Sequence, residues 1–332
     1  MKIAVVILNW NGKQLLAQFL PSIIKFSKHA DIYVADNAST DDSISFIKEN
    51  YPSINLISNT ENGGFAKGYN DALKHIDATL YALVNSDVQV SENWLAPILE
   101  EFQHNANTGI IQPKILDYNH KNKFEYAGAA GGYLDMLGYP YCRGRIFNSL
   151  ETDKAQYNDT TLINWASGAC FFIRSKIFHQ LNGFDEDYYA HQEEIDLCWR
   201  TSNLGYDIKY IGTSTVYHIG GATLDESNSY KTFLNFRNSL YSLVKNLPSN
   251  RIFFFILIRM ILDGIAGLRF SFQGRPIHTL AILKSHISFY GNLRKMLSKR
   301  TFKHNNLKYY DTTSIVWSHF ILNIKKSKNL HH

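Results

Sequence analysis

The first 85 residues alternate between two hydrophobic patterns. Mostly apolar runs of four to six residues, typical of strands buried on both faces, are separated by stretches in which apolar residues recur every three or four positions, as at Leu15, Phe19 and Ile23. The runs are residues 3–8, 31–35, 54–57 and 80–84. Strand and helix in regular alternation predict an α/β fold, in which helices cover both faces of a Rossmann-like, mostly parallel sheet.

Three of these expected strands end in polar segments, at residues 9–12, 36–41 and 85–87. Ligands bind beyond the carboxyl ends of the strands in such sheets, so the three segments are candidates for one site. Asn, Ser and Asp also form turns and cap helices, which is the alternative for Asp87 taken alone. The Gly63-Gly64 pair lacks the spacing of a dinucleotide-binding or P-loop motif.

The segments after residue 116 are less regular. Residues 117–160 are rich in Gly and Tyr and are expected to form a loop region over the site. Regular structure is expected again at residues 165–174, whose small residues allow close approach of a backbone or a ligand. A helix is expected over residues 191–200, with Glu193, Leu197 and Arg200 on one face.

Charge is distributed unevenly along the chain. From Lys245 onward there are 15 Lys and Arg against two acidic residues, which leaves 19 basic and 27 acidic residues before it. The last quarter therefore carries a charge near +13 and the rest a charge near −8. Such a basic segment favours a negatively charged partner, either nucleic acid or the anionic face of a membrane.

The basic segment begins with an apolar run at residues 252–258. Arg259 and Asp263 interrupt it before the roughly 20 residues that a spanning helix needs, so it is not expected to cross a membrane. An amphipathic helix that lies in a membrane interface or packs on the rest of the protein is expected instead. A buried core helix is the alternative.

Composition narrows the class of protein. With 332 residues, 45% hydrophobic and 19% charged, the chain has globular composition. Cys142, Cys170 and Cys198 lack the spacing of a disulfide framework or a zinc site, which fits a reducing compartment. The apolar N-terminus is too short for a signal peptide. A cytoplasmic location, with peripheral contact to the inner membrane, is expected.

Six segments resemble, in order and spacing, glycosyltransferase family 2 enzymes with the GT-A fold. They read VVILNWNG, VADNAST, NTENGGFAKGYN, ALVNSDV, ASGACFFIR and GFDEDYYAHQEEIDLCWR. The resemblance extends in particular to bacterial enzymes of cell-surface polysaccharide synthesis, often described as rhamnosyltransferases. It implies a catalytic domain at 1–240, with a nucleotide-binding half at 1–116 and an acceptor half at 117–240, followed by a basic, mainly helical extension at 241–332.

The resemblance implies an inverting transfer of a sugar from a UDP- or dTDP-linked donor to a hydroxyl of a lipid-linked or cell-surface glycan. A divalent cation, Mg²⁺ or Mn²⁺, would neutralise the leaving diphosphate. Asp87 and His218 match the family's metal ligands, and Asn85 stands where its DxD motif has the first Asp. A lone His is more often structural, and that alternative stays open for His218.

The remaining roles follow from the same resemblance. Glu194 matches the general base that takes the acceptor proton, and its neighbour Glu193 could exchange roles with it. Trp10 would pack on the base, and Asp36 would accept the base's imide N–H. The other nucleotide-sugar residues are Leu8, Asn37, Asn62, Gly64, Asn70, Asn85 and Ser86. The acceptor residues are Trp165, Ser167, Gly168 and Ala169.

Two other functions remain as alternatives. A sugar-phosphate nucleotidyltransferase also has an α/β fold with metal-binding carboxylates, but the chain lacks an evident basic, Gly-rich N-terminal loop for that reaction. A nucleic-acid-binding protein could use the basic C-terminal segment. Carboxylates that converge at strand ends would repel a polyanion, so nucleic acid is not an expected partner.

Overall fold

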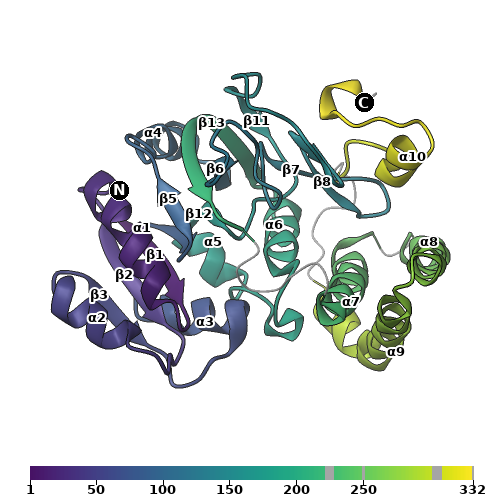
Figure 1. Cartoon of the computed structure of the whole chain (residues 1–332), viewed down its shortest axis with the longest axis horizontal. Helices are drawn as coiled ribbons and strands as arrows, with labels where there is room; N and C mark the ends of the chain where they lie inside the picture. The colour runs from purple at the N-terminus through teal and green to yellow at the C-terminus, as the bar shows by residue number, and fades with distance from the viewer. Residues whose placement is uncertain (221–227, 249–250, 301–308, 331–332) are drawn as a thin grey trace.

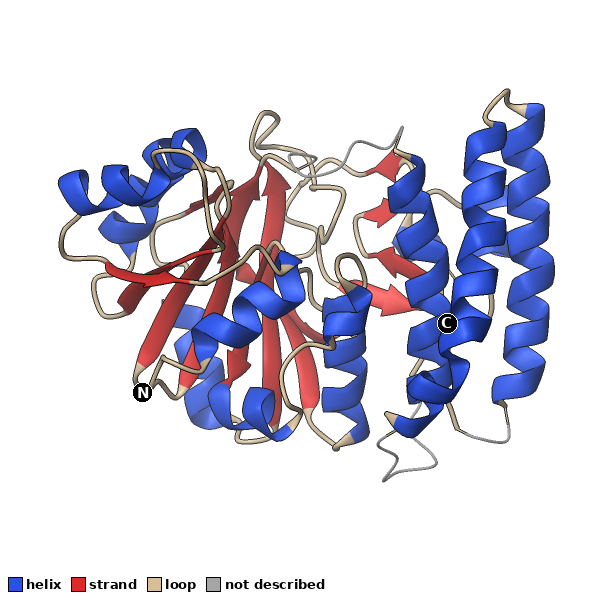
Figure 2. Cartoon of the chain, turned by 90° about the horizontal axis from the view of Figure 1, so that it is seen from below, coloured by secondary structure: helices blue, strands red, loops and turns tan. Residues whose placement is uncertain are grey.

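The structure is a computed structural model, and it describes residues 1–220, 228–248, 251–300 and 309–330. In this part of the chain a central nine-stranded sheet carries helices on both faces, and a group of long helices packs at one side (Figures 1 and 2).

The first half of the sheet is parallel, as predicted. Its strands lie in the order β3-β2-β1-β4. One crossover helix joins each strand to the strand that follows it in the chain. The strands are β1 (Ile3–Asn9), β2 (Asp31–Asp36), β3 (Asn55–Ser58) and β4 (Leu80–Asn85), and the helices are α1 (Lys13–Phe26), α2 (Ser43–Asn50) and α3 (Gly64–Leu73). Val5 of β1 packs in the same cluster as Leu16 of α1, whereas Val6 packs with Tyr69 of α3. Alternate residues of one strand therefore enter the two cores, as a sheet covered on both faces requires.

The second half of the sheet is mixed. β12 (Cys170–Arg174) runs antiparallel between β4 and β6 (Thr108–Asp117), and β13 (Asp207–His218) runs parallel to β6. β5 (Val88–Val90) and β11 (Thr160–Leu162) pair antiparallel with β13. Three helices, α4 (Ala96–His104), α5 (Ser175–Gln180) and α6 (Glu193–Asn203), complete this half. The regular elements expected over 165–174 and 191–200 correspond to β12 and α6.

The expectation of a loop region at 117–160 was wrong in part, because a small antiparallel sheet forms there. Its strands are β7 (Gly132–Leu134), β8 (Pro140–Cys142), β9 (Arg145–Ile146) and β10 (Ser149–Leu150). Strands of two or three residues are too short to show a hydrophobic period. Gly144, at φ 89°, forms the turn between β8 and β9 in a conformation that other residues adopt only with strain.

Gly132 of this small sheet packs against an indole ring. A Cβ at Gly132 would lie 2.2 Å from two ring atoms of Trp165, so no side chain fits without moving the indole. We expect Gly132→Ala to lower the free energy of unfolding by about 1–3 kcal/mol through overpacking. Urea denaturation measures this change. Gly291→Ala is the control, because a Cβ there meets no atom within 4 Å, and its midpoint should stay equal or rise; equal midpoints in both variants would contradict the packing argument.

The C-terminal segment is helical, as predicted. It contains α7 (Ser229–Asn246), α8 (Ile252–Phe272), α9 (Pro276–Ser298) and the short α10 (Ile315–Phe320). The boundary predicted after residue 240 lies inside α7, so the extension continues a helix that already packs on α6. Among the described helices, none combines the length and the hydropathy needed to cross a bilayer.

Candidate functional site

The sheet register brings the predicted polar strand ends together. Asn9 at the end of β1 lies opposite Asp36 of β2, and Leu8 lies opposite Asn85 of β4. The backbone N–H of Asn85 donates to the carbonyl of Ala169, 2.9 Å away, which places the start of β12 at the same edge. One edge of the sheet therefore carries residues from four of the motif segments.

Trp10 and Asp36 differ strongly in exposure. The Trp10 side chain is 53% exposed beyond the end of β1 and is free to stack on a flat ring. The Asp36 carboxylate has no exposed surface and accepts hydrogen bonds from Asn9 Nδ2, Ser39 Oγ and the Ser39 backbone N–H. In this structure Asp36 orders the loop after β2, so the direct contact with a base that the resemblance implies requires that loop to move.

Asn37, Asn62 and Gly64 form a connected group at the start of α3. Asn37 Nδ2 donates to Asn62 Oδ1 at 2.9 Å and to the Gly64 carbonyl at 3.0 Å, and Asn62 Oδ1 also accepts the Gly64 N–H. Gly64 has φ 75°, and a Cβ there would lie 2.9 Å from the carbonyl oxygen of Tyr189. The group holds the first turn of α3 tightly against the loop that precedes α6.

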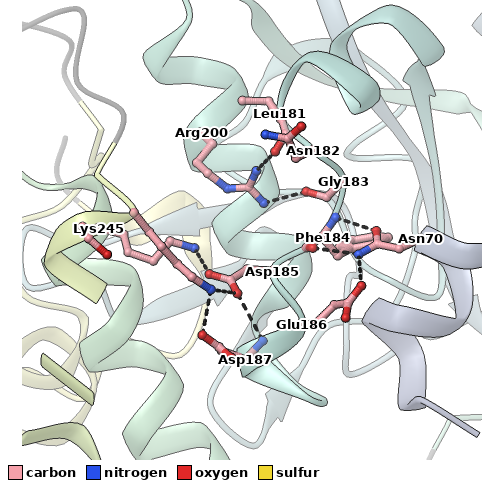
Figure 3. Close-up of a pocket in the computed structure, with 12 residues that line it drawn as sticks. Asn70, Leu181, Asn182, Gly183, Phe184, Asp185, Glu186, Asp187, Arg200 and Lys245 are labelled. Atoms are coloured by element: carbon pink, nitrogen blue, oxygen red, sulfur yellow. Dashed lines mark hydrogen bonds and ion pairs between the residues drawn. The ribbon is translucent and has the colours of Figure 1, made fainter. Parts of the chain in front are cut away.

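Asn70 lies apart from this group, two turns further along α3. Its amide binds the backbone N–H and carbonyl of Phe184 and the carboxylate of Glu186, and it lines a cavity of about 540 Å³ (Figure 3). The two lysines that line that cavity, Lys245 and Lys299, form ion pairs with lining carboxylates. Lys245, for example, donates to Asp185 at 2.6 Å and to Asp196 at 2.8 Å. The structure therefore places Asn70 in a network that ties α3, α6 and α7 together.

Asp87, just beyond the end of β4, and His218, at the end of β13, lie in contact. Asn85 and Ser86 are half-buried and lead into β5, which pairs with β13 so that Val88 lies opposite His218. His218 Nε2 lies 3.1 Å from Asp87 Oδ1, and His218 Nδ1 lies 3.4 Å from Glu125 Oε1. Burial alone would lower the pKa of His218, but its contacts with the two carboxylates outweigh burial and raise the pKa to about 10.

Asp87 and His218 would supply an oxygen and a nitrogen donor to a divalent cation, which would have to displace the proton that His218 carries in this ion pair. Two ligands that bind one ion at about 2.1–2.2 Å and at right angles lie roughly 3 Å apart, and the observed separation of 3.1 Å fits this value. Glu125 lies on the other ring nitrogen, the position from which a carboxylate orients a ligating His. No set of three or more His, Cys, Asp and Glu ligands is arranged around one point in the described residues.

The loop before α6 has an unusual backbone. Tyr189, His191 and Gln192 have φ values of 64°, 67° and 71°, a conformation that costs non-glycine residues energy. Asn238 of α7 compensates, because its Nδ2 donates to the carbonyls of Tyr188, Ala190 and His191 at 2.8–3.0 Å. The strained loop sets where α6 begins, and therefore where its first two carboxylates point.

Glu193 and Glu194 at the start of α6 occupy different surroundings. Glu193 is 5% exposed, and its Oε2 has no hydrogen-bond partner among the described residues. Glu194 is half-buried, and its carboxyl carbon lies 3.9 Å from the point where a Cβ of Gly168 would be. Burial and then the charge of Glu194 raise the pKa of Glu193 well above its ordinary value. Burial raises the pKa of Glu194 to about 7, against backbone hydrogen bonds that favour its charged form.

The four predicted acceptor residues separate into one open position and three buried ones. Gly168 is half-buried between Glu194 and the ring of Phe65. Trp165 donates its Nε1–H to the Tyr133 carbonyl, the Ser167 N–H donates to Gln112 and the Ala169 carbonyl accepts from Asn85. These three residues are 2–4% exposed, so Gly168 is the one of the four that an acceptor could reach directly in this structure.

Sequence reasoning missed Glu125, Asn238 and Tyr189. Glu125 lies in the irregular segment before β7, and no motif or spacing connects it with Asp87 or His218. Asn238 lies on the inner face of a helix, where an Asn is conspicuous only after its burial is known. Tyr189 belongs to the quoted GFDEDYYAHQEEIDLCWR segment, so its position could have been found there.

Comparisons with known proteins bear on both the sequence and the fold. The family model described as "Glycosyl transferase family 2" matches residues 4–181. The chain is 23% identical over 233 residues to the N-acetylglucosaminyl-diphospho-decaprenol L-rhamnosyltransferase of Mycobacterium tuberculosis, which covers 64% of this chain and 75% of that protein. It is 22% identical over 259 residues to the low-salt glycan biosynthesis hexosyltransferase Agl10 of Haloferax volcanii, which covers 76% of each.

Two solved structures share the arrangement of elements. TarS 1-349 of S. aureus, in complex with UDP-GlcNAc, superposes with a TM-score of 0.56 at 14% identity, covering 93% of this chain and 95% of that chain. Mannosyltransferase PcManGT from Pyrobaculum calidifontis, in complex with GDP-Man and Mn²⁺, gives 0.53 at 14% identity, covering 90% and 83%. At such identities the likeness establishes the fold alone, which is the predicted GT-A fold with a helical C-terminal region.

Proposed function

The chain belongs to glycosyl transferase family 2, and from that membership we propose that it transfers a sugar, with inversion, from a UDP- or dTDP-linked donor to an acceptor hydroxyl. The observation that carries the proposal is the position of Glu194, half-buried beside Gly168 at the start of α6. A carboxylate there is suited to take the proton of an attacking hydroxyl. As a family member the chain is a glycosyltransferase, and the nucleotidyltransferase and nucleic-acid-binding alternatives lose their support.

In the proposed reaction the donor lies along the polar edge of the sheet. Trp10 stacks on the base, and the group of Asn37, Asn62 and Gly64 holds the turn of α3 that faces the diphosphate. A divalent cation held by Asp87 and His218 would neutralise charge on the leaving diphosphate. The acceptor oxygen attacks the anomeric carbon from the side opposite the diphosphate, and Glu194 removes its proton as the bond forms.

We assign the acceptor to the class of lipid-linked or cell-surface glycans. The M. tuberculosis relative is named for transfer to N-acetylglucosaminyl-diphospho-decaprenol, and the H. volcanii relative is named for glycan biosynthesis. The half-buried position at Gly168 is the place where such an acceptor would approach Glu194.

A donor screen tests this function. The purified chain is incubated with UDP-, dTDP- and GDP-sugars, with and without Mn²⁺ or Mg²⁺ and with a polyprenyl-diphosphate-linked acceptor sugar, and release of the nucleoside diphosphate is measured. We expect release from a UDP- or dTDP-sugar that requires both the acceptor and the cation. Release of pyrophosphate from a nucleoside triphosphate and a sugar phosphate, or release from a GDP-sugar only, would overturn the proposed donor and reaction.

The raised pKa of Glu194 predicts that kcat decreases as the pH is lowered. A general base works only when unprotonated, so kcat should fall about tenfold per pH unit once the pH drops below about 7. An ordinary Glu side chain would keep its base form to a pH near 4.3. Initial rates at saturating donor and acceptor between pH 5 and 8.5 measure the profile. A rate that stays constant down to pH 5 would exclude this ionisation of Glu194 from the proton-transfer step.

A further inference from the structure

Two of the three charged residues of helix α8 lie on its inner side, and most of its large exposed apolar residues lie on its outer side. Arg259 and Asp263, in the middle of the helix, are 2% and 0% exposed. Arg259 donates to the Leu137 carbonyl and to Ser239 Oγ of α7, and Asp263 accepts from Tyr139 and lies 3.1 Å from His286 of α9. These polar contacts fix which side of α8 faces the protein.

The opposite side of α8 is an unbroken apolar stripe. Its residues are Phe253, Leu257, Ile261, Ile265, Leu268 and Phe272, all between 52% and 88% exposed. Their spacing of three and four positions keeps them on one side over the length of the helix. Helices of a globular protein normally bury such a stripe, and no other described segment of the chain covers this one.

Helix α9 widens the stripe into a face. It runs antiparallel beside α8, as the contacts of Tyr290 with Met260 and of Thr279 with Ser271 show. Leu280, Leu283 and Ile287 of α9 are 55–73% exposed, on the side away from α7. We call the outward stripes of α8 and α9 together the outer face. Figure 1 places α8 and α9 at the side of the molecule opposite β3.

The margin of the outer face is aromatic and basic. Arg269 of α8 lies 4.7 Å from the ring centre of Phe320 at the end of α10, so α10 adjoins the C-terminal end of α8. Trp317 is 58% exposed in this short helix, and Lys325 and Lys326 follow it in the chain. After Lys245 the only acidic residues are Asp263, which is buried, and Asp311.

We propose that the outer face docks on an anionic lipid bilayer, with α8 and α9 lying in the plane of the headgroups. Apolar residues along α8 and the first half of α9, a Trp at the margin and an excess of basic charge are what an interfacial segment needs. A second copy of the chain would bring two surfaces of the same positive sign together, which charge repulsion opposes.

Helix α7 lies between the outer face and the loop that precedes Glu193. Arg259 on the inner side of α8 binds Ser239 of α7, and the neighbouring Asn238 holds the carbonyls of the loop that precedes Glu193. Docking therefore places the start of α6 close to the membrane surface, where a lipid-linked acceptor would be present.

Vesicle co-sedimentation of the full chain tests the proposal. We expect binding to phosphatidylcholine vesicles that contain phosphatidylglycerol, weaker binding to phosphatidylcholine alone, and weakening by salt. The combined variant Leu257→Ser, Ile261→Ser, Ile265→Ser should bind at least about tenfold more weakly, because it removes apolar insertion without changing charge. The control Leu150→Ser, Leu162→Ser changes exposed apolar residues outside the outer face and should bind like the wild type.

A second measurement does not depend on the combined variant folding. Brominated phospholipids quench indole fluorescence at short range, so they should quench the wild-type chain, and Trp317→Phe should lose most of that quenching. Equal vesicle binding by the wild type and a folded combined variant would overturn the proposal. So would a wild-type dimer in sedimentation velocity that the combined variant dissociates, in the absence of vesicle binding, because a second copy would then cover the face.

Discussion

Replacing Glu194 with Gln is expected to lower transfer by about 10²–10⁴-fold, the usual contribution of a positioned general base. The amide has nearly the same size, so donor binding and folding should stay unchanged while kcat falls. Glu194 is the carboxylate of the pair that reaches partly exposed space beside Gly168. Single-turnover transfer with saturating donor and acceptor measures the chemical step, and the apparent Kd for the nucleoside diphosphate serves as the check on binding.

Glu193→Gln is the matched control for this prediction. Glu193 is 5% exposed, and burial, followed by the charge of Glu194, raises its pKa well above the ordinary value, which favours the neutral form that an amide resembles. We expect the Glu193 variant to keep activity within about tenfold of the wild type, since its carboxyl does not act as the base. If Glu193→Gln were inactive and Glu194→Gln active, the two residues would have exchanged roles.

Much of the fold was predictable because its signals are local. The central strands β1 and β4 are apolar on both faces, so each forms a run that ends where polar site residues begin, as at Asn85 after Leu80 to Val84. The antiparallel insertion of β12 between β4 and β6 was not predictable in the same way. Its direction depends on how the chain returns through residues 117–160, where the strands are too short for a period.

The site was predictable in its motif residues but not in its supporting contacts. Asp87 and His218 are recognisable from their segments, whereas Glu125 becomes visible only when β13 pairs with β6 and the bridge between Leu116 and Phe124 brings Glu125 beside His218. The burial of Asp36 was also hidden, because Ser39 and Asn9 close over its carboxylate in three dimensions. Sequence periodicity likewise shows that Arg259 and Asp263 share one side of α8, but not that this charged side faces the protein.

Replacing Asp87 with Ala is expected to lower transfer by at least about 100-fold at every concentration of Mn²⁺ or Mg²⁺. A cation that stabilises the leaving diphosphate contributes several kcal/mol, and each 1.4 kcal/mol is about a factor of ten in rate. Asn85 and Ser86 are neutral, so Asp87 is the only carboxylate in residues 85–87, and neither neighbour can replace its charge. The measurement is kcat across a titration of the metal, with a thermal unfolding curve to establish that the variant folds.

Added metal should affect a variant that lacks a metal ligand differently from one that lacks a residue orienting a ligand. We therefore compare Asp87→Ala with Glu125→Gln. Glu125 lies on Nδ1 of His218, 3.4 Å away, so its loss should loosen the imidazole while leaving both donors in place. Loss of such a supporting carboxylate typically weakens metal affinity 10–100-fold, so excess Mn²⁺ should restore the Glu125 variant. Excess metal should not restore the Asp87 variant, which lacks a donor. Full activity of Asp87→Ala, or identical metal titrations for the two variants, would contradict a metal site at Asp87 and His218 and leave their contact as an internal ion pair.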